Sequence, residues 1–228
     1  MKRTAITNSG ILLACTLFCA DMVWAAAQIS IPEEIEWTWE VRPAHPNSAL
    51  PNVLLIGDSI TRGYYSTVVE KLAPKANVFL FGTSACIGDP RLITQIREFF
   101  AMQRVSFRII HFNNGMHGWA YSESEYGAGF PVLVRTLRAE SRGAQLIWAS
   151  LTPVKSDSPL GPTNSRIDAR NAIAKAWMEK EHIPIDDQHA LMSSHGEEHQ
   201  DAVHFNANGS ALQGGQASTQ IAALLFSK

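Results

Sequence analysis

The chain has 228 residues, and its 19 lysines and arginines nearly balance its 21 aspartates and glutamates. No basic run is present that could follow a phosphate backbone, so the charge pattern argues against a nucleic-acid partner. About 200 residues without internal repeats or low-complexity segments can form one domain with its own core.

The first 27 residues are typical of a secretory signal peptide. Lys2-Arg3 precedes an apolar stretch from Ile11 to Trp24, and Ala25-Ala26-Ala27 offers a cleavage site. The uninterrupted apolar stretch is shorter than the ~20 residues that a spanning helix needs. We therefore expect a secreted or periplasmic protein with no stable membrane insertion after cleavage. Lipoprotein processing at Cys15 is the alternative.

Cleavage near Ala27 would leave Cys86 as the remaining cysteine, so we expect no internal disulfide. Residues 28–52 have little periodicity and contain Trp37, Trp39, Pro43, Pro46 and Pro51. We interpret them as an N-terminal arm laid across the domain, with its tryptophans packed on apolar surface. A tryptophan-lined subsite for a sugar ring is the other interpretation.

From Val53 onward, short apolar runs alternate with longer amphipathic ones. This alternation predicts right-handed crossovers and a parallel sheet covered on both faces. Ligands of such sheets bind outside the carboxyl ends of the strands, so we expect catalytic and binding residues in the loops there. The expected strands are 53–56, 78–81, 107–112, 145–149 and 183–185, and the expected helices are 61–72, 90–102, 123–142, 165–181 and 208–225.

The first predicted strand ends in Gly57-Asp58-Ser59, just before a helix. This arrangement brings the Ser59 hydroxyl to the carboxyl edge of the sheet, where helix N-terminal N–H groups can stabilise a developing negative charge. A simple helix N-cap is the plainer interpretation. A nucleophilic serine also needs a base, an orienting carboxylate and oxyanion donors.

Candidate oxyanion donors follow the next two strands. Gly88 lies just ahead of a helix, so its backbone N–H can point into the same cleft as Ser59, although a turn glycine alone would look the same. Asn113 and Asn114 end the third strand, where a side-chain amide can donate to an oxyanion. One of the two would face the cleft, and the other would brace the turn.

A candidate base lies near the end of the chain. Asp201 and His204 are three positions apart in a polar loop, so the carboxylate can accept from one ring nitrogen while the other faces a serine. Any such pair is weak evidence by itself. The remaining histidines, His111 and His117 among them, lack the spacing of a metal site, so we expect no metal and no cofactor.

Together, Gly-Asp-Ser at 57–59, Gly88, the asparagines after the third strand and Asp-x-x-His before the last helix resemble the SGNH hydrolases of the GDSL esterase superfamily. The similarity runs from about Val53 to the C-terminus. It implies a flavodoxin-like three-layer α/β/α sandwich with a five-stranded parallel sheet. It also implies ester hydrolysis through an acyl-enzyme, without a metal.

The resemblance also implies roles for single residues. The family usually shows Gly-x-Asn-Asp after the third strand, whereas this chain has Phe112-Asn113-Asn114-Gly115. A branch with Asn-x-Gly-x-His there slightly favours Asn113 as the oxyanion donor. We expect Asp58 and His117 to bind substrate. Carried over by position, Ser59 is the nucleophile and first oxyanion donor, Gly88 the second, Asn113 or Asn114 the third, His204 the base and Asp201 its partner.

These inferences lead to one main hypothesis for the domain at residues 53–228. It is an exported serine esterase that removes short acyl groups, acetyl above all, from a carbohydrate or similar polar substrate. The partner would then be a small-molecule or glycan ester. Two alternatives are a non-catalytic exported glycan-binding module on the same fold, and a lipase or lysophospholipase.

Overall fold

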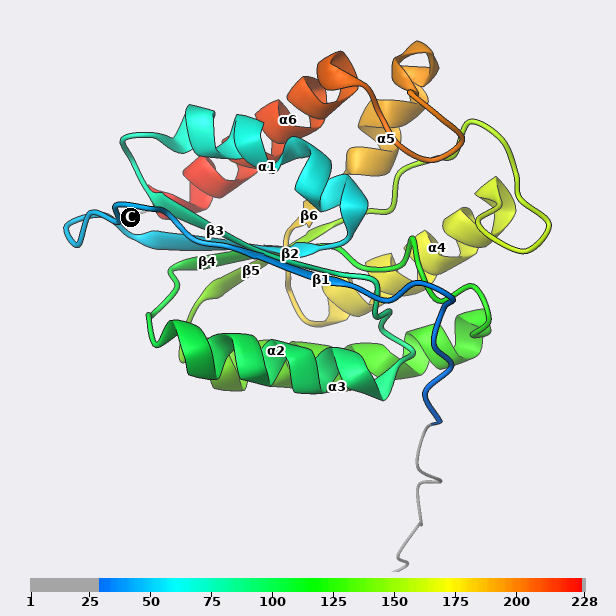
Figure 1. The fold of residues 1–228 in the computed structure, drawn as a ribbon, viewed down its shortest axis with the longest axis horizontal. Helices are drawn as coiled ribbons and strands as arrows, with labels where there is room; N and C mark the ends of the chain where they lie inside the picture. The colour runs from blue at the N-terminus through cyan, green and yellow to red at the C-terminus, as the bar shows by residue number, and fades with distance from the viewer. Residues whose placement is uncertain (1–28, 227–228) are drawn as a thin grey trace, which may run out of the picture.

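A computed structural model describes residues 29–226 and shows a three-layer α/β/α sandwich (Figure 1). The predicted signal peptide and Cys15 lie outside the described residues. Within residues 29–226, none of the helices combines the length and apolar character needed to cross a bilayer.

The central sheet has six strands in the order β1-β3-β2-β4-β5-β6. Five of them are parallel and correspond to the five predicted strands, which confirms the predicted fold class. The predicted strand number is one short, because β1 adds an antiparallel edge strand beside β3. The bounds are β1 Thr38–Val41, β2 Asn52–Gly57, β3 Asn77–Thr83, β4 Ile109–Phe112, β5 Gln145–Ala149 and β6 Ile185–Asp186.

Strand β1 belongs to the N-terminal arm, of which the structure describes residues 29–52. It pairs with β3 from Thr38 opposite Thr83 to Val41 opposite Leu80. Three of its four residues are exposed, so the strand lacks the apolar pattern that marks the others. Its backbone pairing with β3, rather than its own sequence pattern, therefore makes this segment a strand.

Six α-helices within residues 29–226 flank the sheet, and Figure 1 shows α1 and α6 on one face and α2 and α3 on the other. Helix α4 packs against α3, and α5 packs against α6. A 3₁₀ turn at Gly196–Glu198 precedes the loop that carries Asp201 and His204. The helix bounds are α1 Ser59–Leu72, α2 Pro90–Gln103, α3 Glu123–Ser141, α4 Asn164–Lys180, α5 Gln188–Ser193 and α6 Ala207–Leu225.

Strand β2 shows how the sheet separates two apolar cores. Side chains alternate between the faces of a strand, so Val53 and Leu55 pack toward α1 and α6 while Leu54 and Ile56 pack toward α2 and α3. All four are buried, and burying each aliphatic side chain stabilises the fold by roughly 1.5–3 kcal/mol. With both faces covered, the carboxyl edge is where side chains of several strands and loops reach solvent together.

Candidate active site

The turn from β2 into α1 carries Ser59, which is half-buried. A Cβ at Gly57 would lie 2.0 Å from Thr61 Oγ1, so the close approach of helix α1 requires glycine there. Asp58 caps the helix, and its Oδ1 accepts a hydrogen bond of 2.9 Å from the Ile60 N–H. Ser59 is the first helical residue, and helix geometry leaves its N–H without an intrahelical partner.

The structure brings Ser59, His204 and Asp201 together. His204 Nε2 lies 2.8 Å from Ser59 Oγ, across 145 positions of sequence. On the other side of the ring, His204 Nδ1 lies 3.0 Å from Asp201 Oδ2. The loop before α6 therefore holds an imidazole between a hydroxyl and a carboxylate.

Electrostatics select one tautomer of His204. Backbone N–H groups of His204 and Val203 both donate to Asp201 Oδ1 and lower the pKa of this carboxyl to about 2. Asp201 is thus ionised at neutral pH and can only accept, so the neutral His204 ring carries its proton on Nδ1. Its Nε2 is then a proton acceptor facing the Ser59 hydroxyl, which is the arrangement needed to remove a serine proton.

Ser59 and His204 open into a cavity of about 470 Å³. This volume suits a small ligand. Part of the lining comes from loops and the helix near the sheet edge, and two residues come from the N-terminal arm. The lining residues are Glu33, Trp37, Ser59, Arg62, Met116, His117, Trp119, Pro162, Val203 and His204.

Glu33 of the arm binds the loop between β4 and α3. Its carboxylate lies 2.7 Å from His117 Nδ1 and accepts a 2.7 Å hydrogen bond from the Gly118 N–H. Burial disfavours the charged form of both side chains, but these contacts outweigh it, so the pKa of Glu33 is lowered and that of His117 is raised. The pair is therefore an ion pair in weakly acidic solution.

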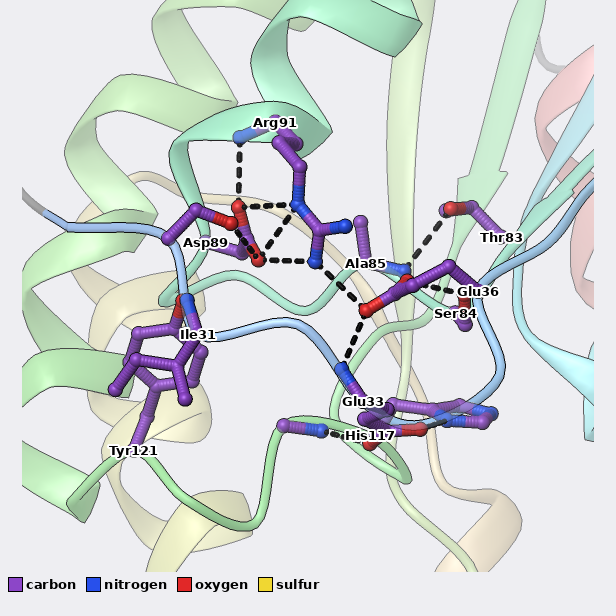
Figure 2. Close-up of polar contacts among 12 residues, drawn as sticks. Ile31, Glu33, Glu36, Thr83, Ser84, Ala85, Asp89, Arg91, His117 and Tyr121 are labelled. Atoms are coloured by element: carbon purple, nitrogen blue, oxygen red, sulfur yellow. Dashed lines mark hydrogen bonds and ion pairs between the residues drawn. The ribbon is translucent and has the colours of Figure 1, made fainter.

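Further polar contacts fasten the arm, as Figure 2 shows. Glu36 accepts hydrogen bonds from Arg91 at 2.8 Å and from Ser84 Oγ at 2.7 Å. The Ile31 N–H donates to Tyr121 Oη at 2.6 Å. The arm is thus held by side chains from the loop after β3, from helix α2 and from the loop between β4 and α3.

The two residues expected to bind substrate lie in different environments. His117 lines the cavity, and Trp37 packs against it with ring centroids 5.7 Å apart. Asp58 is fully buried and is not among the residues that line the cavity, so a substrate contact for it stays a prediction. Its observed role is to cap the helix that begins with Ser59.

The predicted oxyanion donors Gly88, Asn113 and Asn114 are all buried and do not line the cavity. Asn114 Oδ1 accepts from the Ile87 N–H at 2.7 Å, and its Nδ2 donates to the Ala85 carbonyl at 2.9 Å. Asn114 thus braces the loop that carries Gly88. Asn113 Nδ2 instead donates to the carbonyl of Ala149, at the end of β5.

Sequence reasoning missed Arg170, which organises the loop between β4 and α3. This fully buried guanidinium donates to the carbonyls of Gly115 at 2.7 Å and of His117 and Gly118 at 3.0 Å each. It also stacks on Trp119, 3.9 Å from the ring centroid. An arginine in a helix predicts no such role, because its partners are backbone carbonyls of a distant loop.

One other reactive side chain, Cys86, can be placed. Burial raises the pKa of the Cys86 thiol to about 11, so it is protonated at neutral pH and is a poor nucleophile. In the part of the chain that the structure describes, no three His, Cys, Asp or Glu side chains are grouped to hold a metal ion.

Comparison with known proteins identifies the fold. No family model and no curated protein sequence matches the chain. Among solved structures, it is similar to a member of the lipolytic G-D-S-L family from Veillonella parvula, with a TM-score of 0.59 and 22% identity over 73% of this chain and 95% of that one.

It is also similar to an acetylxylan esterase from Geobacillus stearothermophilus, with a TM-score of 0.60 and 16% identity over 78% of this chain and 95% of that one. A carbohydrate esterase family 3 structure from Talaromyces cellulolyticus has a TM-score of 0.59 and 16% identity, over 77% and 98% of the two chains. These likenesses confirm the predicted SGNH hydrolase fold.

Proposed function

We propose that this chain is a serine esterase of the SGNH hydrolase superfamily, acting on short acyl esters of a carbohydrate or similar polar alcohol. The observation that carries the proposal is the 2.8 Å separation of Ser59 Oγ and His204 Nε2, with Asp201 on the far side of the ring. A binding module would have no need of a hydroxyl, an imidazole and a carboxylate in this order.

In the proposed mechanism, His204 Nε2 takes the Ser59 proton as Oγ attacks the ester carbonyl carbon. The imidazolium, stabilised by Asp201, then protonates the leaving alcohol as the ester C–O bond breaks. Water, deprotonated by His204, attacks the acyl-enzyme and releases the carboxylic acid. Ser59 recovers its proton, so the net reaction consumes one water for each ester bond.

The oxyanion would be stabilised first by the Ser59 N–H at the start of α1. Asn113 and Asn114 each use one carboxamide N–H for a backbone carbonyl and keep a second N–H, so the choice between them as a further donor stays a prediction. The role of Gly88 stays a prediction.

A polar substrate is supported by the composition of the cavity and by the similar structures. Trp37 and Trp119 offer aromatic faces for a sugar ring, and Glu33, Arg62 and His117 offer polar groups. Two of the similar structures are described as an acetylxylan esterase and a carbohydrate esterase. Export to the periplasm or the medium is proposed from the sequence of residues 1–27 alone.

The test is Ser59→Ala, assayed by acetate release from acetylated sugars and from 4-nitrophenyl acetate. Loss of the nucleophile should lower kcat/KM by at least ~10³, by analogy with other serine triads. Ser66→Ala, on the exposed side of the same helix, is the matched control and should behave as wild type.

A fluorophosphonate should label the wild type and the control but not the Ser59 variant. Absence of labelling in the wild-type protein, or full activity in the Ser59 variant, would refute a serine esterase and favour a binding module. A profile of 4-nitrophenyl esters of increasing length should fall beyond short acyl chains. A preference for long chains would replace this substrate assignment with a lipase.

A further inference from the structure

We propose that Arg62 recognises a negative charge on the substrate, so that the preferred ester has a carboxylate-bearing alcohol part such as an acidic sugar. This inference rests on the proposed esterase function and assigns the substrate class within it. It is carried by the position of Arg62, by the aromatic rings that hold it, and by the pairing of the other charges around the cavity.

Arg62 lies one helical turn after Ser59 on α1, and both residues line the same cavity. Residues three apart on a helix share a face, so a substrate whose ester reaches Ser59 also lies beside Arg62. The arginine side chain is exposed. A ligand can therefore reach its guanidinium without rearrangement of the core.

Two tryptophans of the N-terminal arm support this guanidinium. Its central carbon lies 5.7 Å from the ring centroid of Trp37 and 5.0 Å from that of Trp39. A cation–π contact holds a guanidinium near aromatic rings without using its N–H groups as hydrogen-bond donors, so they stay available to a bidentate partner. Within residues 29–226, Arg62 has no hydrogen-bond or ion-pair partner.

The other charged groups near the cavity already have partners. Glu33 contacts His117, and the Asp201 carboxylate accepts a hydrogen bond from the neutral ring of His204. Among the described residues that line the cavity, Arg62 is thus the permanent cation without a counter-ion. An anionic group on a bound ester would supply that counter-ion, while a neutral ester would not.

A carboxylate is an anion whose shape suits this site. Its two coplanar oxygens match the guanidinium fork. A carboxylate attached to a ring, as in a uronic acid, lets the ring contact the aromatic walls at the same time. Trp37 and Trp119 provide such walls.

The test uses matched pairs of acetyl esters that differ in charge. The first pair is 4-acetoxybenzoate and 4-acetoxybenzamide, together with their 3-isomers, and the second is mono-O-acetylated methyl glucuronide and methyl glucoside. The measured quantity is the ratio of kcat/KM for the anionic ester to that for its neutral partner. Arg62→Gln should lower this ratio about tenfold, because it replaces a charge-assisted pair.

Arg62→Lys should give an intermediate ratio, since it keeps the charge but loses the planar fork. Arg135→Gln, which removes an exposed arginine from α3, is the matched control and should keep the wild-type ratio. Raising NaCl from 0.02 to 0.5 M should lower the wild-type ratio and leave that of Arg62→Gln unchanged.

An Arg62→Gln ratio within twofold of the wild-type ratio would overturn the proposal, as would an equal fall in Arg135→Gln. A preference for sulfated over carboxylated sugar acetates would overturn the choice of a carboxylate. Each of these results would leave the esterase proposal intact, because the kcat/KM ratio can be measured only on an enzyme that still hydrolyses esters. Only the absence of Ser59-dependent turnover and labelling would refute both the esterase proposal and the proposed role of Arg62.

Discussion

Replacing Glu33 with Gln tests whether the arm is a functional wall of the cavity. Glu33 contacts His117 and the Gly118 N–H, each at 2.7 Å. A hydrogen bond to a charged group contributes about 1.5–3 kcal/mol, against about 1 kcal/mol for a neutral one. Glutamine can keep a neutral bond to the Gly118 N–H but loses the ion pair.

The Glu33 side chain is 33% exposed, so solvent screening reduces what the ion pair contributes. We therefore expect the loss to be about 1–2 kcal/mol. Such a loss corresponds to roughly a tenfold change in the local opening equilibrium. Amide hydrogen exchange at Gly118, followed at pH 6, should accelerate by about that factor. The value of kcat/KM should fall, because the loop between β4 and α3 is then held less firmly beside the cavity.

The matched control is Glu34→Gln, because Glu34 is an exposed neighbour. Equal exchange rates at Gly118 in the two variants would refute the view that Glu33 holds this loop. Unchanged kcat/KM together with accelerated exchange would refute the view that the arm contributes to catalysis.

The same contact predicts a pH dependence. The raised pKa of His117 means that its contribution is complete below its ordinary value of 6.5 and is lost as pH rises through the raised pKa. The lowered pKa of Glu33 means that its contribution is complete above 4.5 and is lost as pH falls through the lowered pKa. Protection of Gly118, corrected for intrinsic exchange, should thus be greatest between about pH 4.5 and 6.5 and decline above it.

Two further predictions concern the core and the loop before α6. Arg170→Gln leaves buried carbonyls without their donor and should cost about 3 kcal/mol or more, or roughly 6–12 °C in Tm by circular dichroism. A Tm shift no larger than that of Arg135→Gln would show that the hydrogen bonds of Arg170 do not stabilise the fold. Asp201→Asn can donate to His204 Nδ1 and so favours the wrong tautomer, which should lower kcat by ~10²–10⁴ at pH 7. An Asn variant with near-full rate would show that Asp201 is not the orienting group.

Strand and helix positions were largely predictable because they depend on local patterns. The predicted strand at 145–149 has the bounds observed for β5. The strand predicted from Phe107 begins instead at Ile109, where pairing with Val53 starts. Phe107 is buried against Phe79 without being in the sheet, and an apolar run by itself does not separate these two cases.

Local spacing also brought Asp201 and His204 within reach of each other, since three positions in one loop allow a direct contact. It gave no means of choosing between Asn113 and Asn114, because their partners belong to different distant segments. Asn114 contacts the loop after β3, whereas Asn113 contacts the end of β5.

By itself, the sequence determined the alternation of strands and helices and the chemical identity of Ser59 and His204. Only the tertiary structure decided that these two side chains meet, and that Glu33, Trp37 and Arg62 join them around one cavity. The physical reason is that apolar periodicity reports the burial of each element on its own. A cavity is built from contacts between segments far apart in the chain, which no local pattern records.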